Sequence, residues 1–389
     1  RTLPTRFGAQ SRDGRGQMSQ LPAVDVVVVG GGVIGCASAY ELRKAGLSVA
    51  IVEAREVASA ASGASAGGVR QQGRDPRELA IAMRAIARWP TLEDELGADL
   101  HYRQDGHLTL VAREEDLPAL EARVRDEQAR GLGIRIVRRD ELDELAPGLG
   151  PDIIAGAWCP TDGHAMPILV TKAFCAAAQR RGATLYEWTA VTGFRLEGDR
   201  VVGVHTTRGE IPCRSVLIAA GAWSRDLARM VGVELPIEPH ALQMMVTNPM
   251  PPRLKPVVTC VGRRLSLKQL RSGAYLLGGG WPGSVDWEGR FGRNRVASMA
   301  GSAVDASAVY PLLRRTRVVR AWTGLEAIAA DEVPILGPVP GVEGMVLACG
   351  FSGHGFALSP CIGELMAELI ATGRTSLPLD ALSLDRFAA

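Results

Sequence analysis

Residues 24–53 read VDVVVVGGGVIGCASAYELRKAGLSVAIVE, and this stretch decides the fold. A run of valines ends at GGGVIG (30–35), a helix of small residues is expected over 36–45, and a second apolar strand (48–52) ends at Glu53. Strand, glycine turn, helix, strand and acid within about thirty residues form the pattern of a dinucleotide-binding βαβ unit. The sequence therefore predicts a Rossmann-type domain that begins here.

Each glycine of this turn has its own expected role. Gly30 permits the tight turn, Gly32 lets a diphosphate approach the backbone, and Gly35 lets the helix pack closely on the strand. Free N–H groups and the helix dipole favour an anion at the start of the helix. Glu53 is expected to accept hydrogen bonds from a ribose 2′-OH, which suits FAD or NAD and repels a 2′-phosphate.

The composition is that of a soluble globular protein with room for two domains. Of 389 residues, 47% are hydrophobic and 22% are charged, and the net charge of +2 gives no reason to expect nucleic-acid binding. No apolar run reaches the roughly 20 residues of a transmembrane helix. The seven cysteines are dispersed without metal-ligand spacing, which predicts reduced thiols in a cytoplasmic protein and no metal site.

Two more glycine turns follow later in the chain. An apolar strand (216–220) meets Gly221, and Gly353-His354-Gly355 precedes the final helix (356–371). Alternatively, the first is an ordinary strand-to-helix turn and the second a helix cap with a surface histidine. Residues 58–70 are mostly small and form either a linker or a loop along a diphosphate and flavin. Three glycine turns together favour an extended cofactor, FAD, over NAD.

The order of expected elements predicts an α/β fold in two parts. Separate segments of the chain are expected to form a Rossmann-type FAD-binding domain. The segments between them are expected to form an α+β substrate domain with a largely antiparallel sheet. The first 17 residues are basic and lack the apolar core of a secretory signal, so they are expected to form a flexible leader. The leader is expected at 1–20. The FAD-binding domain is expected at 21–99, 150–235 and 325–389, and the substrate domain at 100–149 and 236–324.

These motifs resemble the FAD-dependent amine oxidases of the D-amino-acid oxidase superfamily, especially the glycine oxidase and sarcosine oxidase β-like branch, with iminodiacetate-oxidase-like enzymes. The likeness runs from about Asp25 to Thr372. The matching pieces, in order, are GGGVIG with Glu53, SGASAGGVR, DGHAMP, LIAAGAWS, YLLGGGWPG, AWTGLEAIAADEVPILGPVPG and GFSGHGFALSP. The resemblance implies the p-hydroxybenzoate-hydroxylase type of fold, with elongated FAD in the first domain and the second domain's sheet covering the flavin.

The chain departs from its relatives at three places. Glycine oxidases carry a WAGLRP-like segment whose arginine binds the substrate carboxylate, whereas this chain has Glu326 there. A lysine follows GHGF in monomeric sarcosine oxidases, and here Ala357 does. The covalent flavin cysteine expected near Leu325 is also missing. We therefore expect non-covalent FAD and a carboxylate anchor elsewhere.

Candidates for the site follow from the motifs and the resemblance. Lys268 is expected to attract a carboxylate or to promote oxygen reduction. The alternative is an ordinary lysine on an exposed strand edge. Glu326 would pair with a substrate ammonium or with an arginine such as Arg320, and His354 would order its loop rather than act as a base. The catalytic candidates are Lys268, Glu326 and His354, and the substrate-binding candidates are Arg70, His240, Arg264, Lys268, Arg271, Arg320 and Glu326. The cofactor-binding candidates are Gly30, Gly32, Val33, Ile34, Gly35, Glu53, Ala54, Arg55, Ser62, Ser65, Ala66, Gly67, Gly68, Val69, Val191, Ala220, Gly221, Trp223, Gly324, Leu325, Ser352, Gly353, His354, Gly355, Phe356 and Ala357.

The resemblance implies oxidation of the C–N bond of a small amino acid or secondary amine. Expected substrates are N-substituted glycines such as sarcosine, glycine or iminodiacetate, or a cyclic imino acid. Hydride transfer to flavin, imine hydrolysis and reoxidation by O2 with H2O2 formation would complete the reaction. Alternatives are the flavin subunit of a dye-linked or quinone-linked dehydrogenase complex, peripheral to a membrane in the quinone case, a non-catalytic FAD-binding assembly protein, or an NAD-dependent dehydrogenase. A homo-oligomer or a hetero-oligomer is compatible with each of these functions.

Overall fold

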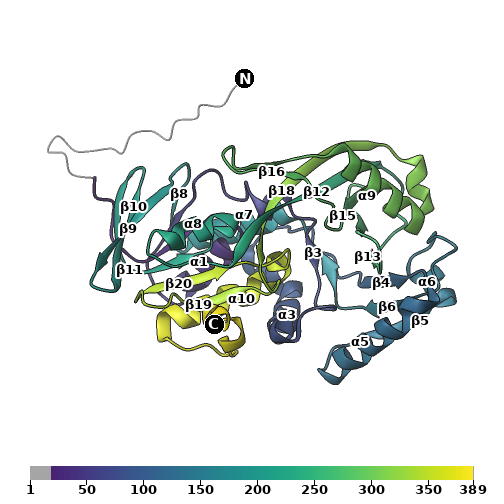
Figure 1. Cartoon of the computed structure of the whole chain (residues 1–389), viewed down its shortest axis with the longest axis horizontal. Coiled ribbons are helices and arrows are strands. Elements are labelled where there is room, and N and C mark those ends of the chain that lie inside the picture. The colour runs from purple at the N-terminus through teal and green to yellow at the C-terminus, as the bar shows by residue number, and fades with distance from the viewer. Residues whose placement is uncertain (1–18, 389) are drawn as a thin grey trace.

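The computed structural model describes residues 19–388 and is built on two large sheets. The sheets occupy the two halves of an elongated molecule (Figure 1). Residues 1–18 of the expected leader lie outside the described residues. The last part of that leader is not loose, because the N–H of Glu210 donates to the carbonyl of Ser19 (2.9 Å) and the N–H of Leu21 to the carbonyl of Glu210 (2.8 Å).

The first sheet is the Rossmann-type sheet that the opening valines predict. Its main path runs β19-β20-β11-β1-β2-β8, and β10 and β9 extend from β11. The central strand β1 is parallel to both β2 and β11. Val26, Val27 and Val28 are at most 1% exposed, as expected of a strand covered on both faces. The strands are β1 (Val24–Val29), β2 (Val49–Val52), β8 (Thr184–Tyr186), β9 (Val191–Glu197), β10 (Arg200–Thr206), β11 (Gly209–Ile218), β19 (Ile335–Pro338) and β20 (Met345–Cys349).

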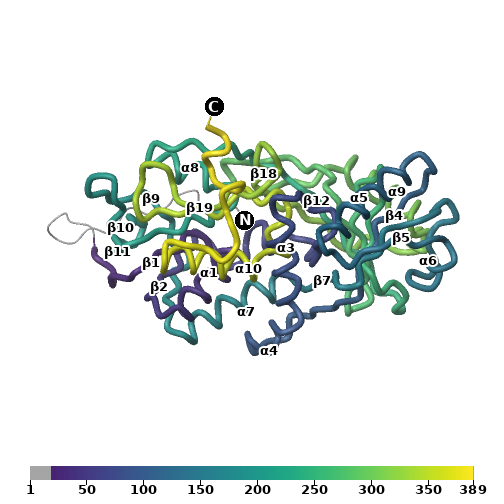
Figure 2. The backbone as a smooth tube through the Cα atoms, turned by 90° about the horizontal axis from the view of Figure 1, so that it is seen from below, coloured from purple at the N-terminus to yellow at the C-terminus, as the bar shows by residue number. Residues whose placement is uncertain are grey.

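Four helices cover one face of this sheet. Helix α1 packs on α10 and on α7, and α10 also packs on α3. Figure 2 shows α1 and α10 next to each other. The helices of this half are α1 (Val33–Lys44), α2 (Ala61–Ala64), α3 (Pro76–Arg88), α4 (Leu92–Leu96), α7 (Pro167–Arg180), α8 (Ser224–Arg229) and α10 (Gly355–Thr372).

Helix α10 is the one helix among residues 19–388 that is long and apolar enough to span a membrane. Of its apolar stretch, 67% is buried inside the protein, and it lies in the core against α1. Core helices of water-soluble proteins commonly meet the same length and composition test, so it is weak evidence for a membrane span.

The second sheet is largely antiparallel, as expected. Its order is β18-β12-β15-β14-β13-β4-β6-β5, and only β13 and β4 pair in parallel. Helix α9 packs on one face through Ala306, Val309 and Tyr310, which join Leu267 and Tyr275 in one core. The strands are β4 (His107–Val111), β5 (Arg135–Arg138), β6 (Ala155–Cys159), β12 (Ile237–Pro249), β13 (Val257–Cys260), β14 (Ser266–Gln269), β15 (Ala274–Gly278) and β18 (Val318–Ala329), and the helices are α5 (Leu117–Ala129), α6 (Arg139–Leu145) and α9 (Val296–Val309).

Short strands and one long strand connect the two halves. Strand β3 (Gly68–Val69) pairs with β7 (Gly163–His164), and β16 (Ser284–Asp286) forms a hairpin with β17 (Phe291–Arg293). Strand β18 pairs with β12 as far as Ala329, and β6 belongs to the second sheet. The expected domain limits at 150 and 325 therefore fall before β6 and inside β18, and we propose moving them to the ends of these two strands.

Candidate functional site

A cavity of about 290 Å³ opens at the carboxyl ends of β1, β2 and β11. Strand β1 lies between β2 and β11, so the strand order of the sheet reverses at this point. Ligands of open α/β sheets bind where the strand order reverses. The cavity extends from Glu53 at the end of β2 to Gly353 and Gly355 at the start of α10. It thus connects the front, middle and end of the chain.

The opening glycines have separate structural causes. Gly30 has φ +115°, and an added Cβ would lie 2.4 Å from the carbonyl oxygen of Ala219, so only glycine fits. A Cβ at Gly35 would lie 2.0 Å from the carbonyl oxygen of Gly30 in the helix–strand contact. Gly32 differs, because its backbone is extended (φ −76°, ψ 174°) and its nearest neighbour would be Ser62 Oγ at 3.2 Å. Its lack of a side chain keeps the cavity open.

Backbone donors hold Glu53 at the end of β2. Its Oε2 accepts from the N–H of Gly31 (2.7 Å) and its Oε1 from the N–H of Arg55 (2.8 Å). Burial raises the pKa of this carboxyl. Glu53 lines the cavity with spare acceptor capacity, which matches its expected role toward a ribose.

The cavity brings together most of the residues expected around a cofactor. Those that line it are Gly30, Gly32, Val33, Ile34, Glu53, Ala54, Arg55, Ser62, Ser65, Val191, Ala220, Gly221, Trp223, Gly324, Leu325, Gly353, Gly355 and Phe356. The other candidates do not line it: Gly35, Ala66, Gly67, Gly68, Val69, Ser352, His354 and Ala357. An extended chamber with a floor of small residues, an acid at one end and a helix N-terminus at the other fits FAD.

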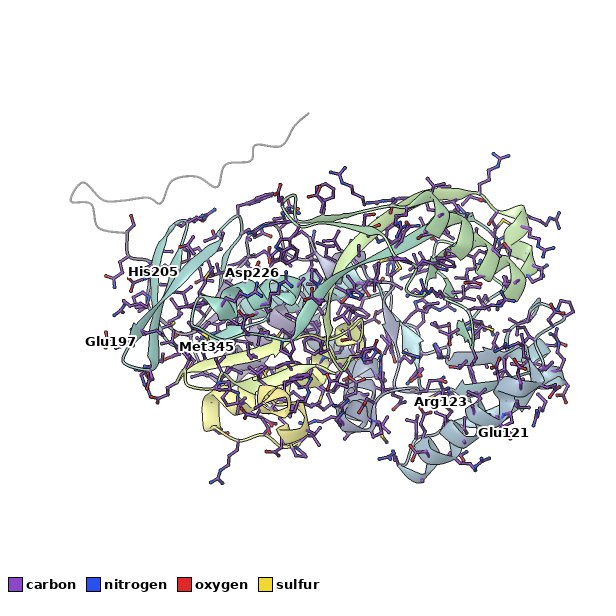
Figure 3. The ribbon with its side chains drawn as sticks, in the orientation of Figure 1. Glu121, Arg123, Glu197, His205, Asp226 and Met345 are labelled. Atoms are coloured by element: carbon purple, nitrogen blue, oxygen red, sulfur yellow. The ribbon has the colours of Figure 1, made fainter. Side chains whose placement is uncertain are left out.

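A second cavity, of about 470 Å³, lies on the other side of the α10 N-terminus. It is lined by Arg74 and Arg123, by the start of α3, and by His354. Figure 3 labels Arg123 on α5 and Asp226 on α8, which line the second and the first cavity respectively and lie in different halves of the molecule.

Arg74 and Arg123 each carry a buried nitrogen without a hydrogen-bond partner in this second cavity. Arg74 is the more buried of the two. It is 8% exposed, and its Nε and Nη2 donate to the carbonyl of Arg70 (3.2 and 3.1 Å). Its Nη1 is buried and has no hydrogen-bond partner. Burial lowers the pKa of Arg74 to about 9, so the guanidinium stays charged at neutral pH. A buried, unsatisfied cation points to an anionic ligand.

His354 pairs with a buried acid. Its Nδ1 lies 2.8 Å from Oε1 of Glu78, which is 0% exposed. Burial and the charge of Arg74 lower the pKa of His354. His354 is the N-cap residue of α10 and its side chain is half-buried, and the Glu78 contact agrees with its expected role in ordering the loop.

Glu326 lies on β18 and faces the first cavity. Burial raises its pKa to about 7, while the N–H of Gly353 acts in the opposite direction. Within residues 19–388 no basic side chain lies within ion-pair distance of Glu326, so the alternative pairing with Arg320 is wrong. Arg320 instead stacks over Trp322, with its guanidinium carbon 5.6 Å from the ring centre.

Lys268 is buried in the middle of the second sheet. Strand β14 lies between β13 and β15, so the interpretation as an exposed strand edge is wrong. Lys268 is 2% exposed, its Nζ has no hydrogen-bond partner, and burial lowers its pKa to about 7. It faces away from α9, because Leu267 joins the α9 core and successive strand residues alternate. The charge of Lys268 also contributes to the lowered pKa of His164, so the two side chains lie near each other.

Comparison with known proteins agrees with this geometry. Residues 25–369 match the family model described as FAD dependent oxidoreductase. The chain is a member of this FAD-dependent oxidoreductase family. It is 31% identical to the beta subunit of sarcosine oxidase from Rhodobacter capsulatus, over 93% of this chain and 88% of that protein. It is also 31% identical to the glycine oxidase of Geobacillus kaustophilus, over 93% and 97% of the two chains.

Solved structures show the same fold. The crystal structure of L-proline dehydrogenase from P. horikoshii has a TM-score of 0.88 and 30% identity, covering 95% of this chain and 99% of that one. This oxidoreductase fold confirms the expected combination of an FAD-binding domain and a substrate domain.

Among the expected substrate ligands only Glu326 lines either cavity. The others line neither: Arg70, His240, Arg264, Lys268, Arg271 and Arg320. Arg271 is 64% exposed and lies 2.7 Å from Asp99. Arg264 and Arg320 are exposed and stack on tryptophans, and His240 is exposed on β12 opposite Glu326. Arg70 differs, because burial lowers its pKa and it lies beside Asp162 and Arg123.

Sequence reasoning missed two groups of residues. Arg74 and Glu78 follow the small-residue segment. The cluster of charged residues in QQGRDPRE (71–78), directly after that segment, was the signal that could have indicated them. The stretch Arg290–Gly292 lines the first cavity although it belongs to the β16–β17 hairpin of the substrate half. No motif marks that hairpin, because its position depends on contacts between the two halves.

Proposed function

We propose that this FAD-dependent oxidoreductase oxidises the C–N bond of a small amino acid or secondary amine that carries a carboxylate. One observation supports this most: a buried cation, Arg74, and a cavity acid, Glu326, lie on opposite sides of the α10 N-terminus. A substrate carboxylate would match Arg74, and a substrate amine would match Glu326.

Arg74 is our choice for the carboxylate anchor. Five acids also line its cavity. Asp75 and Asp331 pair with Arg77 (2.9 and 2.6 Å), and Asp126 pairs with Arg130 (2.9 Å). Glu127 lies 3.8 Å from Arg123, and Glu332 is exposed. The Nη1 of Arg74 stays unsatisfied. A charge-assisted hydrogen bond to a carboxylate would satisfy it.

Glu326 would hold the amine end. With a pKa raised to about 7, its carboxyl is poised to accept a proton from the amine near neutral pH. Removal of that proton leaves the amine neutral, as oxidation requires. FAD supplies the electron acceptor for this chemistry when it is bound. The free N–H groups at the start of α10 would stabilise negative charge at the flavin end of the cavity.

We also propose that FAD is held without a covalent bond. Cysteine, histidine and tyrosine are absent from the described residues that line the first cavity. Acid precipitation of the purified protein should therefore release all flavin into the supernatant. Flavin that stays in the protein pellet would contradict this.

The amine substrates fall into three groups: N-substituted glycines such as sarcosine or iminodiacetate, glycine itself, and cyclic imino acids such as proline. The test is an anaerobic screen of these compounds and of D-amino acids, following flavin absorbance. Bleaching by at least one carboxylated amine is expected. Bleaching only by amines without a carboxylate would overturn the role of Arg74, and bleaching by none would overturn the proposal.

A second candidate is the flavin subunit of a dye-linked or quinone-linked dehydrogenase complex. It is favoured because several relatives are named as subunits of larger enzymes, among them a subunit of sarcosine oxidase and a subunit of opine oxidase. Stoichiometric H2O2 from the isolated chain would support the oxidase, and reduction of a dye without H2O2 would support the dehydrogenase. We place the protein in the cytoplasm, because its seven cysteines are free thiols, and at the membrane surface only in the quinone-linked case.

A further inference from the structure

The β16–β17 hairpin extends from the substrate half over the FAD-binding half. Its strands pair between Ser284–Asp286 and Phe291–Arg293, and its tip spans residues 287–290. Figure 1 shows β16 near the middle of the molecule, above α7 and beside β18. The tip contacts two elements of the other half, which are α8 and the loop after β2.

Aromatic and polar contacts hold the tip in place. Trp287 stacks on Trp223, with ring centres 5.9 Å apart and an interplanar angle of 18°. The guanidinium of Arg225 lies 5.1 Å from the centre of the Trp287 ring. On the other side, Nη2 of Arg55 donates to the carbonyl of Gly289 (2.9 Å). Stacked rings and a cation over a ring each stabilise such a contact.

The tip also forms part of the wall of the first cavity. Arg290, Phe291 and Gly292 line it, together with Trp223 and Arg55. Arg290 has φ +56°, a left-handed conformation that is rare outside glycine and is common where a loop clamps a ligand.

The two arginines on this wall add positive charge at one end of the cavity. Burial and then the charge of Arg55 lower the pKa of Arg290, while the charge of Asp226 acts in the opposite direction. The nearby cavity acids are Glu53 and Asp226. Glu53 is bound to backbone N–H groups. Asp226 lies 3.7 Å from both Arg225 and Arg229, and its charge also acts on Arg290. An anionic ligand group between the two arginines would relieve their repulsion.

We propose that the β16–β17 hairpin is a binding subsite for the adenosine-phosphate half of FAD, supplied to the cofactor by the substrate domain. The subsite lies at the Glu53 end of the cavity, away from the α10 N-terminus. It rests on the proposal that FAD fills the first cavity. Flavin mononucleotide lacks the adenylyl group, so it gains nothing from the hairpin. The hairpin therefore selects the dinucleotide, and FAD leaves only when the Trp287 contact opens.

The test compares two flavins on three variants of the full chain. Trp287→Ala removes the stacking contact, and Arg290→Ala removes the cation from the cavity wall. Glu288→Gln is the matched control, because Glu288 is exposed in the same tip and does not line the cavity. Apoprotein is titrated with FAD and with flavin mononucleotide, and release of FAD from the holoprotein is followed by flavin fluorescence.

We expect each of the two test variants to raise the Kd for FAD by about tenfold or more, the loss typical of one buried aromatic or charge-assisted contact. FAD release should accelerate by a similar factor. The Kd for flavin mononucleotide should not change, and Glu288→Gln should match the parent for both flavins.

Equal losses for the two flavins, or no loss for FAD, would overturn the subsite. Arg290→Ala keeps the test valid if Trp287→Ala does not fold. Failure of the cofactor proposal itself looks different, because the parent protein would then be colourless and would bind neither flavin.

Discussion

The two cavities on either side of the α10 N-terminus are built in different ways. The first is shaped by backbone: Gly30 and Gly35 have no room for a Cβ, and backbone N–H groups fix Glu53. The second is made of charged side chains, among them Arg74 and His354, which come from separate segments. A site defined by backbone geometry tolerates few sequences, whereas a site of side chains can change its ligand by substitution. This contrast fits a shared cofactor and variable substrates.

Gly32→Val breaks the first cavity and is expected to have the largest effect. The Gly32 backbone is extended, so valine fits the main chain, but its side chain enters the space where the diphosphate should lie. FAD content after purification should fall below about one hundredth of the parent value, since several phosphate hydrogen bonds are lost together. The control is Gly133→Ala, because a Cβ there meets nothing within 4 Å. Normal flavin absorbance in the Gly32 variant would contradict the placement.

Arg74→Ala tests the second cavity and should leave FAD bound. Loss of a charge-assisted hydrogen bond of about 2–3 kcal/mol should raise KM about 30- to 150-fold, with a smaller change in kcat. Arg130→Ala is a matched control, because Arg130 lines the same cavity but is 45% exposed and pairs with Asp126. Equal kinetics for the parent and the Arg74 variant would remove this residue from the substrate site.

The residues changed in these two variants differ in how well the sequence alone predicts them. The glycine turns and Glu53 are predictable because a diphosphate and a ribose demand particular residue types at fixed spacing. The combination of Arg74 and Glu326 is not predictable in this way, because the loop before α3 and strand β18 are distant in sequence and no fixed spacing relates them. Arg271 illustrates the reverse error: it has the right chemistry and a neighbouring strand position, yet it pairs with Asp99 at the surface.

Glu326→Gln should change the pH dependence of the reaction, because Glu326 lines the first cavity. The parent carboxyl, with its pKa raised to about 7, acts in its ionised form, so kcat/KM should rise as the pH rises through about 7. The glutamine variant should lose this limb and be about tenfold slower above pH 7. Parallel pH profiles for the two proteins would show that another group titrates.

Lys268→Met should leave FAD bound, slow turnover modestly and increase stability. The folded-state pKa of Lys268 is lowered to about 7, so the folded protein binds fewer protons than the unfolded chain between about pH 7 and 10. The parent is therefore least stable below pH 7 and gains stability toward pH 10. The rise in Tm caused by methionine should be larger at pH 6 than at pH 9.5. A pH-independent Tm difference would contradict the buried, unpaired ammonium, and unchanged steady-state kinetics would remove Lys268 from the reaction.

A crystal structure of the protein purified with its flavin tests the central claim most directly. We expect FAD stretched through the first cavity, with its ribose at Glu53, its diphosphate over Gly32 and its isoalloxazine at Gly353–Gly355. Electron density for FAD elsewhere, or a colourless protein with an empty cavity, would contradict it.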